Sequence, residues 1–339
     1  MNRFSPGGKR LIAAGLAAGA LAATAGWVAN KARRAEDDEP PRGTFLDVDG
    51  VRVHYLDRGR GVPIVLLHGN AVRLQDFVAS GLIDRLAQHH RVIAFDRPGF
   101  GYSERPRDRL WAASAQADLL HKAIKQLGVE RPIVIGHSWG TLVALELALH
   151  ENTAVQKLIL VSGYYFPTAR LDVALAAPQA IPVLGDVMRY TVSAVFARLL
   201  LGRTVKAMFA PQPVPKDFLP ILVREMLVRP AQIRANAEDA AFMVPGAAAL
   251  SKRYGELTIP VTIFAGEDDK VVDPETNARR LHAELSNSEL HIIPSLGHML
   301  HYAVPEQLVA AVAFNRIPAA GSNIERQGAS LPAELGVTT

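Results

Sequence analysis

Between residues 44 and 165, short unbroken apolar runs alternate with segments in which apolar residues recur at helical spacing. The runs are rich in Val, Ile and Leu, which is typical of strands buried on both faces of a parallel sheet. They occupy residues 63–67, 91–95, 132–135 and 157–161. The segments with helical spacing are residues 76–88, 111–127 and 140–150. Strands that alternate with helices predict an α/β fold, in which helices cover both faces of a mostly parallel sheet.

The pattern extends beyond this region in both directions. Residues 45–48 and 51–55 are joined by Asp49-Gly50, which predicts an antiparallel hairpin before the first parallel strand. Strand and helix patterns also resume towards the C-terminal end of the chain. The strands expected there are 260–265 and 289–293, and the helices begin at Pro274 and Pro305.

Residues 166–250 interrupt the alternation, and we expect them to form a helical cap between the two parts of the sheet domain, 44–165 and 251–316. Prolines are frequent in this insertion, which predicts short helices because proline cannot donate a backbone hydrogen bond. The loops at the carboxyl ends of parallel strands form the ligand site of such folds. A cap over these ends would therefore contribute side chains to a substrate pocket.

Residues 11–29 are uncharged, and basic residues flank them on both sides. A helix of this length nearly spans the roughly 30 Å hydrocarbon core of a bilayer, so we expect residues 1–43 to hold a membrane anchor and a linker. A cleaved signal peptide is the alternative, because Ala23-Thr24-Ala25 fits the small-residue cleavage pattern, and cleavage would leave an exported protein. A soluble helix rich in Ala and Gly is a third interpretation. The linker at 40–43 is expected to keep this segment outside the sheet domain.

Composition excludes some classes of function. The chain has 339 residues and a formal net charge of +4, and its dispersed basic residues do not favour binding to nucleic acid. It has no cysteine, which excludes disulfides, a cysteine nucleophile and thiolate metal sites. Motifs for metals or phosphates are absent, so we expect no cofactor and no metal. Residues 317–339 show no period and are expected to form a disordered tail, and the pattern leaves the oligomeric state open.

The segment Gly136-His137-Ser138-Trp139-Gly140 lies between the strand at 132–135 and an almost wholly apolar helix. A strand that becomes a helix within so few residues needs a sharp turn, and the two glycines let the flanking backbones approach each other. Ser138 is then expected at the tip of the turn with its hydroxyl exposed, in the position of a nucleophile. The amide of Trp139 would lie at the N-terminus of the new helix, where unpaired N–H groups favour negative charge.

A serine nucleophile needs a base, and the base needs an acid to orient it. His298 follows the last strand, beside a glycine, and is the expected base. His301, one helical turn later, is its nearest rival. Asp268 and Asp269 both follow the penultimate strand, and only one of these adjacent side chains can point towards the histidine.

Other chemically tempting residues have simpler structural explanations. His68 and His137 are expected to support turns. Asp96 and Arg97 are expected to hold their loop in place, and Glu146 is expected to be a paired or half-exposed side chain of an apolar helix.

Five motifs of this chain resemble, in their order, those of the α/β-hydrolases: His68-Gly69, Asp96 to Ser103, Gly136 to Gly140, Gly266-x-x-Asp269 and Gly297-His298. The resemblance covers about residues 44–316. It implies a mostly parallel eight-stranded sheet flanked by helices, a helical cap insertion, and a triad in the chain order Ser, acid, His. Its Gly-x-x-Asp spacing selects Asp269 as the acid. The expected oxyanion hole consists of the amides of Asn70 and Trp139. A role for Asn70 as a turn residue or as the cap of the helix at 76–88 is an alternative.

Within this family the chain most resembles the capped branch of epoxide hydrolases, haloalkane dehalogenases and related esterases. The first two of these use Asp as nucleophile, whereas this chain has Ser138. We therefore expect a serine hydrolase that cleaves a small apolar carboxylic ester or related acyl substrate through an acyl-enzyme. Hydrolysis of C–C bonds and perhydrolysis are alternatives with the same triad. A non-catalytic ligand receptor on this scaffold is an alternative of another class.

Overall fold

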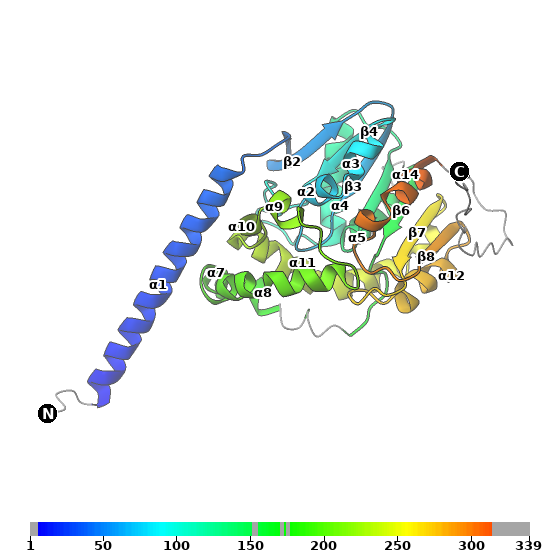
Figure 1. Cartoon of the computed structure of the whole chain (residues 1–339). Coiled ribbons are helices and arrows are strands. Elements are labelled where there is room, and N and C mark those ends of the chain that lie inside the picture. The colour runs from blue at the N-terminus through cyan, green and yellow to red at the C-terminus, as the bar shows by residue number, and fades with distance from the viewer. Residues whose placement is uncertain (1–5, 151–154, 170–172, 174–176, 314–339) are drawn as a thin grey trace, which may run out of the picture.

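The computed structural model describes residues 6–150, 155–169, 173 and 177–313. Its centre is an eight-stranded sheet with helices on both faces, as Figure 1 shows. The strands are β1 (Thr44–Val48), β2 (Val51–Arg58), β3 (Val62–Leu67), β4 (His90–Phe95), β5 (Ile133–His137), β6 (Lys157–Val161), β7 (Val261–Gly266) and β8 (Ser288–Ile293). Their order across the sheet is β1-β2-β4-β3-β5-β6-β7-β8. This confirms the predicted α/β fold.

The sheet is parallel except at one edge. The strands β1 and β2 form the predicted antiparallel hairpin, and β2 pairs antiparallel with β4. Asp49 and Gly50 form the turn with φ of 52° and 74°, values that Asp and Gly tolerate best. In the parallel part, Gly136 of β5 is in register with Leu67 of β3 and Leu160 of β6. The loops that follow these strands therefore begin side by side.

Two hydrophobic cores cover the two faces of the sheet. One contains buried residues of α4 (Ala113–Gln126), α5 (Gly140–Leu149) and α12 (Arg280–Glu284). The other contains buried residues of α2 (Gln75–Ala79), α3 (Leu82–Leu86), α13 (Leu300–Ala303) and α14 (Pro305–Ala313). Two further short turns are η2 (Tyr254–Glu256) and η3 (Glu275–Arg279). The prediction of one helix over 76–88 was wrong, because Gly81, with φ of 71°, divides it into two.

The cap consists of the helices between β6 and β7. They are η1 (Ala177–Ala180), α7 (Leu184–Tyr190), α8 (Val192–Phe209), α9 (Phe218–Leu222), α10 (Arg224–Leu227) and α11 (Pro230–Leu250). The prediction that all of them would be short was wrong, since α8 has 18 residues and α11 has 21. No proline occurs in α8, and Pro230 lies in the first turn of α11, where its missing N–H costs nothing. The helix α11 also accommodates Pro245 in its interior.

A single long helix, α1 (Pro6–Asp38), precedes the sheet and projects from the body (Figure 1). Among the described helices it is the one long and apolar enough to cross a membrane, a test that signal sequences also pass. Its second half packs on the cap, where Val28 is fully buried against Ala194 and Ile233. This contact is with the cap, so the expectation that the segment stays outside the sheet domain remains a prediction. The predicted tail, residues 317–339, lies outside the described residues.

The close approach of backbones beside the turn at Ser138 gives a test of the fold. A Cβ atom at Gly140 would lie 2.7 Å from the carbonyl oxygen of His68 and closer still to that of Leu67. We expect Gly140→Ala to lower the free energy of unfolding by about 2–3 kcal/mol, because backbone atoms on both sides must shift. Chemical unfolding of the full chain in detergent measures this change in the free energy of unfolding.

Gly202 supplies the matched control. It lies on the exposed side of α8, and no heavy atom lies within 4 Å of a Cβ placed there. Gly202→Ala should stabilise the protein slightly, by up to about 1 kcal/mol, through helix propensity. Equal effects of the two substitutions would contradict the proposed crowding at Gly140.

Candidate active site

Ser138 lies at the tip of the turn between β5 and α5. Its φ is 51°, a left-handed conformation that is strained for a residue with a side chain. Hydrogen bonds hold it there: its N–H donates to the carbonyl of Val161 at 2.9 Å, and its own carbonyl accepts from the Thr141 hydroxyl at 2.6 Å. The side chain of Ser138 is half-buried, in contrast to the buried residues on either side of it.

His298 and Asp269 form a buried pair on neighbouring loops. The loops follow β8 and β7, and His298 Nδ1 lies 2.8 Å from Asp269 Oδ2. The other oxygen of Asp269 accepts from the backbone N–H groups of Val271 and Val272, at 2.8 and 3.0 Å. These donors fix the carboxylate, which in turn orients the imidazole. Asp268 is half-buried and makes no hydrogen bond to His298, so the geometry distinguishes the two adjacent carboxylates.

The loop of His298 is tied to the residue that precedes the nucleophile. His137 Nε2 lies 3.2 Å from the carbonyl oxygen of His298, and the two rings are 5.1 Å apart. Within the described residues the Ser138 hydroxyl makes no direct hydrogen bond to the His298 ring. Such catalytic contacts are commonly long in ligand-free sites and shorten when substrate binds. The rival histidine, His301, is engaged elsewhere, with its Nε2 at 2.9 Å from Asp76 Oδ2.

Asn70 and Trp139 lie on the two sides of the turn, as expected for donors to an oxyanion. In the described part of the chain, neither backbone N–H has a hydrogen-bond partner. Trp139 is buried, and its indole N–H donates to the carbonyl of Asp239 in α11 at 2.9 Å. A Cβ at Gly69 would lie 2.9 Å from Ser138 Cβ, so only a glycine lets the loop before Asn70 pass this close to Ser138.

Arg97 organises the loop at residues 68–73, which we call the oxyanion loop. Its fully buried guanidinium donates to the carbonyls of His68 and Gly69, at 2.8 and 3.1 Å, and to Asn70 Oδ1 at 2.9 Å. It also forms an ion pair with Asp239, at 2.6 Å. The prediction that Arg97 has a structural role agrees with these contacts. By holding this loop, Arg97 nevertheless also positions the backbone N–H of Asn70.

The cap also holds the oxyanion loop directly. Asn236 Oδ1 accepts from the N–H of Ala71 at 2.8 Å, and the Gln232 side chain donates to the carbonyl of Val72 at 3.0 Å. Gln232, Asn236 and Asp239 lie on one face of α11, at positions i, i+4 and i+7. We did not predict these cap residues. Their helical spacing in a mostly apolar segment was the signal that could have found them.

Two buried histidines near the site are held neutral. Burial, together with the charge of Arg97, lowers the pKa of His68 to about 3. Its Nδ1–H donates to the Gly69 carbonyl at 2.7 Å, and its Nε2 accepts from the N–H of Arg97 at 3.0 Å. Burial and the neighbouring His301 lower the pKa of His137 well below its usual value. Both therefore act as fixed, uncharged supports of the turns.

One cluster among the described residues has the composition of a metal site. Asp76, His137 and His301 are buried, and each offers a ligand atom within 4.8 Å of the others. The carboxylate of Asp76 already accepts from His301 and, at 2.8 Å, from the Tyr302 hydroxyl. A metal would have to displace the hydrogen bond between Asp76 and His301. We therefore interpret the cluster as a polar support beneath the turn at Ser138.

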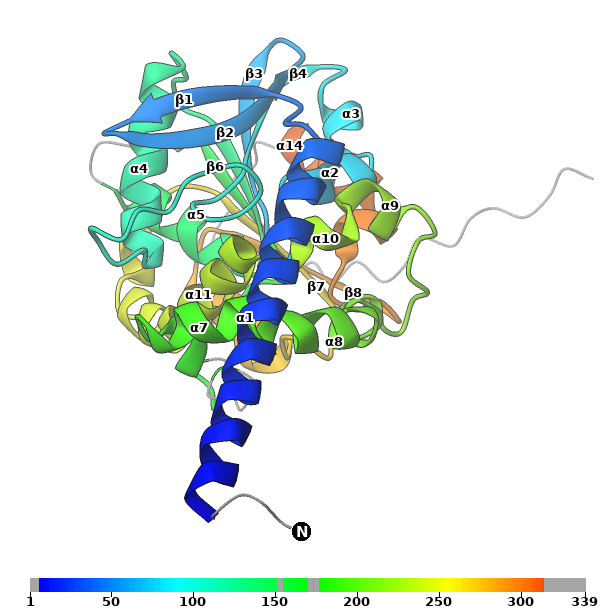
Figure 2. The ribbon, with the colours of Figure 1, turned by 90° about the vertical axis from the view of Figure 1, so that its left-hand side faces the viewer.

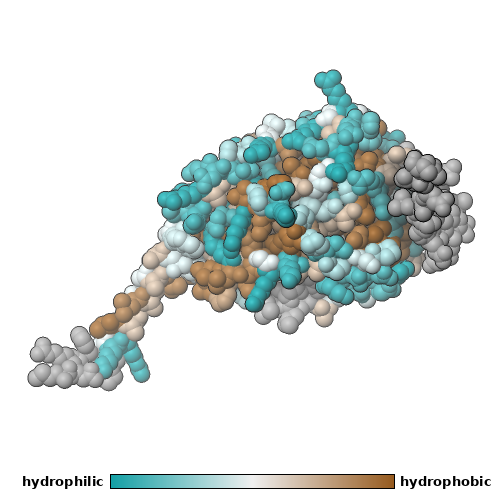
Figure 3. Space-filling model, viewed as in Figure 1, coloured by the Kyte–Doolittle hydropathy of each residue, from teal (hydrophilic) through white to brown (hydrophobic). Residues whose placement is uncertain are grey.

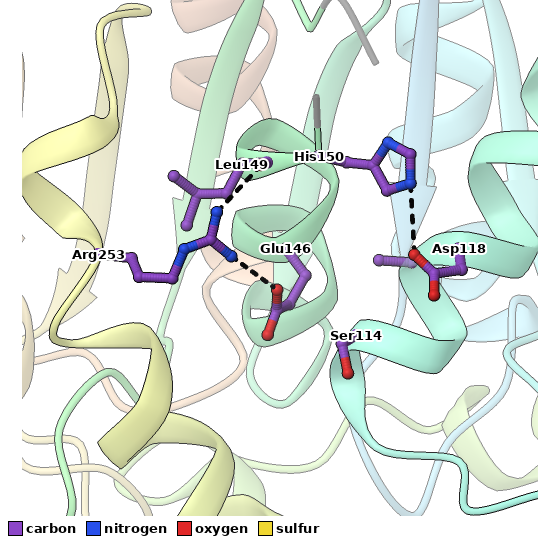
Figure 4. Close-up of a pocket in the computed structure, with 7 residues that line it drawn as sticks. Ser114, Asp118, Glu146, Leu149, His150 and Arg253 are labelled. Carbon is purple, nitrogen blue, oxygen red and sulfur yellow. Dashed lines mark hydrogen bonds and ion pairs between the residues drawn. The ribbon is translucent and has the colours of Figure 1, made fainter. Parts of the chain in front are cut away.

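A surface hollow between α4 and α5 lies away from Ser138 (Figure 4). Figure 4 shows Arg253 reaching towards Glu146 and the carbonyl of Leu149, at 3.7 and 3.2 Å. Burial raises the pKa of Glu146, and Arg253 counteracts this effect. Glu146 is thus paired, as expected, and this hollow does not contain the predicted triad.

Comparisons with known proteins agree with the fold. The family model for the alpha/beta hydrolase fold matches residues 62–303. The chain belongs to the alpha/beta hydrolase fold family. Its relatives include haloalkane dehalogenase 2 of Mycobacterium tuberculosis, 24% identical over 80% of this chain and 94% of the relative. They also include the 2-hydroxymuconate semialdehyde hydrolase of Pseudomonas putida, 28% identical over 78% of this chain and 90% of the relative.

A similar solved structure is the esterase of Exiguobacterium antarcticum. It superposes with a TM-score of 0.66 and 21% identity, covering 80% of this chain and 98% of the esterase. At this identity the likeness supports the fold. Because the relatives are hydrolases and match nearly their full lengths, the chain is an enzyme of the hydrolase class.

The pair of Arg97 and Asp239 predicts a large effect on stability. Asp239 is fully buried and also accepts from Arg105 and Gln116, at 2.9 and 3.0 Å. We expect Asp239→Asn to lower the free energy of unfolding by about 3–5 kcal/mol, because it leaves the buried guanidinium of Arg97 without its counter-charge and removes one of the two carboxylates that pair with Arg105. Chemical unfolding of the full chain measures the change.

The neighbouring Glu238 is the control for this prediction. It is partly exposed and forms its ion pairs with Arg105 and Arg234 at the rim. We expect Glu238→Gln to cost about 1 kcal/mol or less. A loss at Asp239 no larger than that at Glu238 would contradict the proposed role of the buried pair.

The low pKa of His68 predicts that acid destabilises the fold. Between its folded pKa of about 3 and the unfolded value of 6.5, the unfolded chain binds a proton that the folded chain does not. The stability that neutral His68 permits is therefore complete above pH 6.5 and is lost as the pH falls towards 3. Each pH unit within this window should remove up to about 1.4 kcal/mol for this residue.

Unfolding curves at pH 7, 6 and about 5, which span the ordinary titration range of histidine, test this loss of stability. His68→Asn is the comparison. The variant should lose less stability between the two lower pH values than the parent does. Parallel pH profiles for variant and parent would rule out the buried neutral state of His68.

Proposed function

We propose that this enzyme is a serine hydrolase that cleaves a carboxylic ester or related acyl substrate, with Ser138, His298 and Asp269 as its triad. The observation that supports this most strongly is the buried hydrogen bond of 2.8 Å between His298 and Asp269, on loops beside a strained, half-buried serine. Serine is a weak nucleophile unless a base removes its proton, and an acid must orient that base.

In the proposed mechanism, His298 Nε2 takes the proton of Ser138 as Oγ attacks the substrate carbonyl. Asp269 holds the Nδ1–H and stabilises the imidazolium. The tetrahedral intermediate then collapses, and the alcohol leaves with the proton from His298. His298 next takes a proton from water, which attacks the acyl-enzyme. The acid is released as Ser138 recovers its proton.

Asn70 and Trp139 are the proposed oxyanion hole. Their backbone N–H groups have no partner within the described chain and are free to donate to the developing negative charge. One such donor contributes roughly 3–4 kcal/mol to the transition state. The Arg97 contacts hold Asn70, and the indole contact to Asp239 holds Trp139, so the hole is fixed before substrate binds.

Hydrolysis of a C–C bond is the second candidate. It is favoured by the likeness to 2-hydroxymuconate semialdehyde hydrolase over most of both chains. Dehalogenation is less compatible with the site despite the likeness to haloalkane dehalogenase 2. Displacement of a halide by a serine hydroxyl would leave an ether, which water does not cleave, whereas an acyl-serine ester is readily hydrolysed.

We also propose that residues 11–29 anchor the enzyme in a membrane. The helix α1 runs without a break through the small residues 23–25, and the part beyond them packs on the cap. Glu36 extends this contact through an ion pair of 2.5 Å with Arg229. A segment with a packed, charged interface to the enzyme is more consistent with a retained anchor than with a cleaved signal.

The triad predicts that hydrolysis depends on three residues and not on their neighbours. We expect Ser138→Ala to abolish both turnover of p-nitrophenyl esters and labelling by a fluorophosphonate probe. Asp269→Asn should reduce kcat by about ten-thousand-fold, because His298 loses the partner that fixes its tautomer. Steady-state kinetics and mapping of the labelled peptide are the measurements.

Asp268→Asn is the matched control, since it removes the adjacent carboxylate and leaves the pair with His298 intact. It should retain activity within about threefold. Labelling at another residue, or full activity of Asp269→Asn, would contradict the triad. Tight ligand binding without turnover would instead identify a receptor, and turnover of vinylogous diketones alone would favour the C–C hydrolase.

A further inference from the structure

The cap exposes large apolar side chains beside the helix α1. Figure 3 shows brown residues where α1 leaves the body, over the position that α7 and the start of α8 occupy in Figure 1. We call this the apolar cap face. Its members are Ile181, Val183, Leu184, Val187, Tyr190, Val192, Phe196, Leu199 and Leu200, exposed by between 37% and 73%. Contiguous exposed apolar patches of this kind mark sites that bind another protein, a ligand or a membrane.

The spacing of these residues shows that the face is a regular feature of both helices. In α8, Val192, Phe196 and Leu199 lie at positions i, i+4 and i+7, on the side opposite buried Ala194 and Leu201. Val183, Val187 and Tyr190 follow the same spacing at α7. Helices with one apolar side turned away from the core are typical of segments that lie in a membrane interface.

Charge is largely absent from the apolar cap face or is neutralised. Asp186 of α7 pairs with Arg107 at 2.5 Å and with Arg189 at 2.7 Å. Exposed Arg203 and Lys206 follow the apolar stripe further along α8. Basic residues at the end of an apolar stripe are suited to the phosphates of lipid headgroups.

The position of α1 relates this face to a bilayer. The last turns of its apolar segment pack on the cap, with Val28 buried against Ala194 of α8. Trp27 is half-exposed at this junction, and the Arg198 guanidinium lies 5.1 Å from its ring centre. Tryptophan at the end of an apolar helix is typical of the membrane–water boundary. In both ribbon views α7 and α8 run across the direction of α1 (Figures 1 and 2), as helices in the plane of a membrane would.

We propose that the apolar cap face docks on the surface of the lipid bilayer into which α1 inserts. This inference rests on the proposed anchor, and it adds that the cap itself is a membrane-contacting element. If residues 11–29 insert in the bilayer, the C-terminal end of this segment, which contacts the cap through Val28, brings the cap to the headgroup level, where Phe196 and Leu199 enter the interface. The cap that borders the oxyanion loop then faces the lipid, which favours acyl substrates that partition into membranes.

The absence of cysteine makes the test direct, because any introduced thiol is unique. Single variants Phe196→Cys and Leu199→Cys would carry an environment-sensitive fluorophore on the apolar cap face. Leu16→Cys reports on α1, and Glu130→Cys is an exposed control before β5. Each labelled full-length protein is placed in vesicles of phosphatidylcholine and phosphatidylglycerol that contain lipids with a quencher in the acyl chain near the headgroup or near the bilayer centre.

Fluorescence at 196 and 199 should be quenched at least about twofold more than at 130, chiefly by the shallow quencher. The label at 16 should respond to the deep one. Water-like emission at 196 and 199 with quenching at 16 would overturn the docking while leaving the anchor intact. Water-like emission at 16 as well would overturn both. Disulfide cross-links between copies of the unlabelled Leu199→Cys protein, without quenching of the labelled protein by lipid, would assign the face to a second copy of the chain and overturn the proposal. Ester turnover measured on the same vesicles tests the triad separately.

Discussion

The buried ion pair between Arg97 and Asp239 is the interaction on which the rest of the site depends. It joins a loop after β4 to the cap helix α11, and the same guanidinium holds two carbonyls and one side chain of the oxyanion loop. A buried pair contributes little net stability compared with apolar packing, but separating it is costly. The cap cannot shift on the core without exposing these charges, so the pair fixes the position of the cap over the proposed triad.

The geometry of the candidate site therefore depends on the cap as well as on the sheet. The register of β3, β5 and β6 brings the oxyanion loop beside Ser138, and the sheet alone would achieve that. Arg97 and Asn236, however, hold the loop that carries the backbone N–H of Asn70. The carbonyl of Asp239 orients the Trp139 ring. The cap therefore contributes to the orientation of the proposed oxyanion hole as well as to the surroundings of the substrate.

The same division explains what the sequence could predict. Unbroken apolar runs are confined to buried parallel strands, so the strands were located to within about two residues, and the glycines beside Ser138 predicted its turn. The cap helices were less predictable, because proline counts do not reveal that α8 falls between two prolines. The ion-pair partner of Arg97, Asp239, lies 142 residues away and could be found only from helical spacing on α11. Choosing Asp269 over Asp268 required the family resemblance, whereas the structure distinguishes them by one hydrogen bond.

The strained turn at Ser138 shows why so many neutral polar contacts surround this site. A left-handed serine persists only where the neighbouring structure determines it, and here the Val161 carbonyl, the Thr141 hydroxyl and the close packing of Gly69 do so. A charged histidine beneath the turn would need solvation that the packing denies, and burial keeps His68 and His137 neutral. His298 and His301 differ from these two in that each has a buried carboxylate partner, Asp269 for His298 and Asp76 for His301. Because His301 Nε2 is engaged with Asp76, His298 is the histidine at this edge that we propose accepts the proton of Ser138.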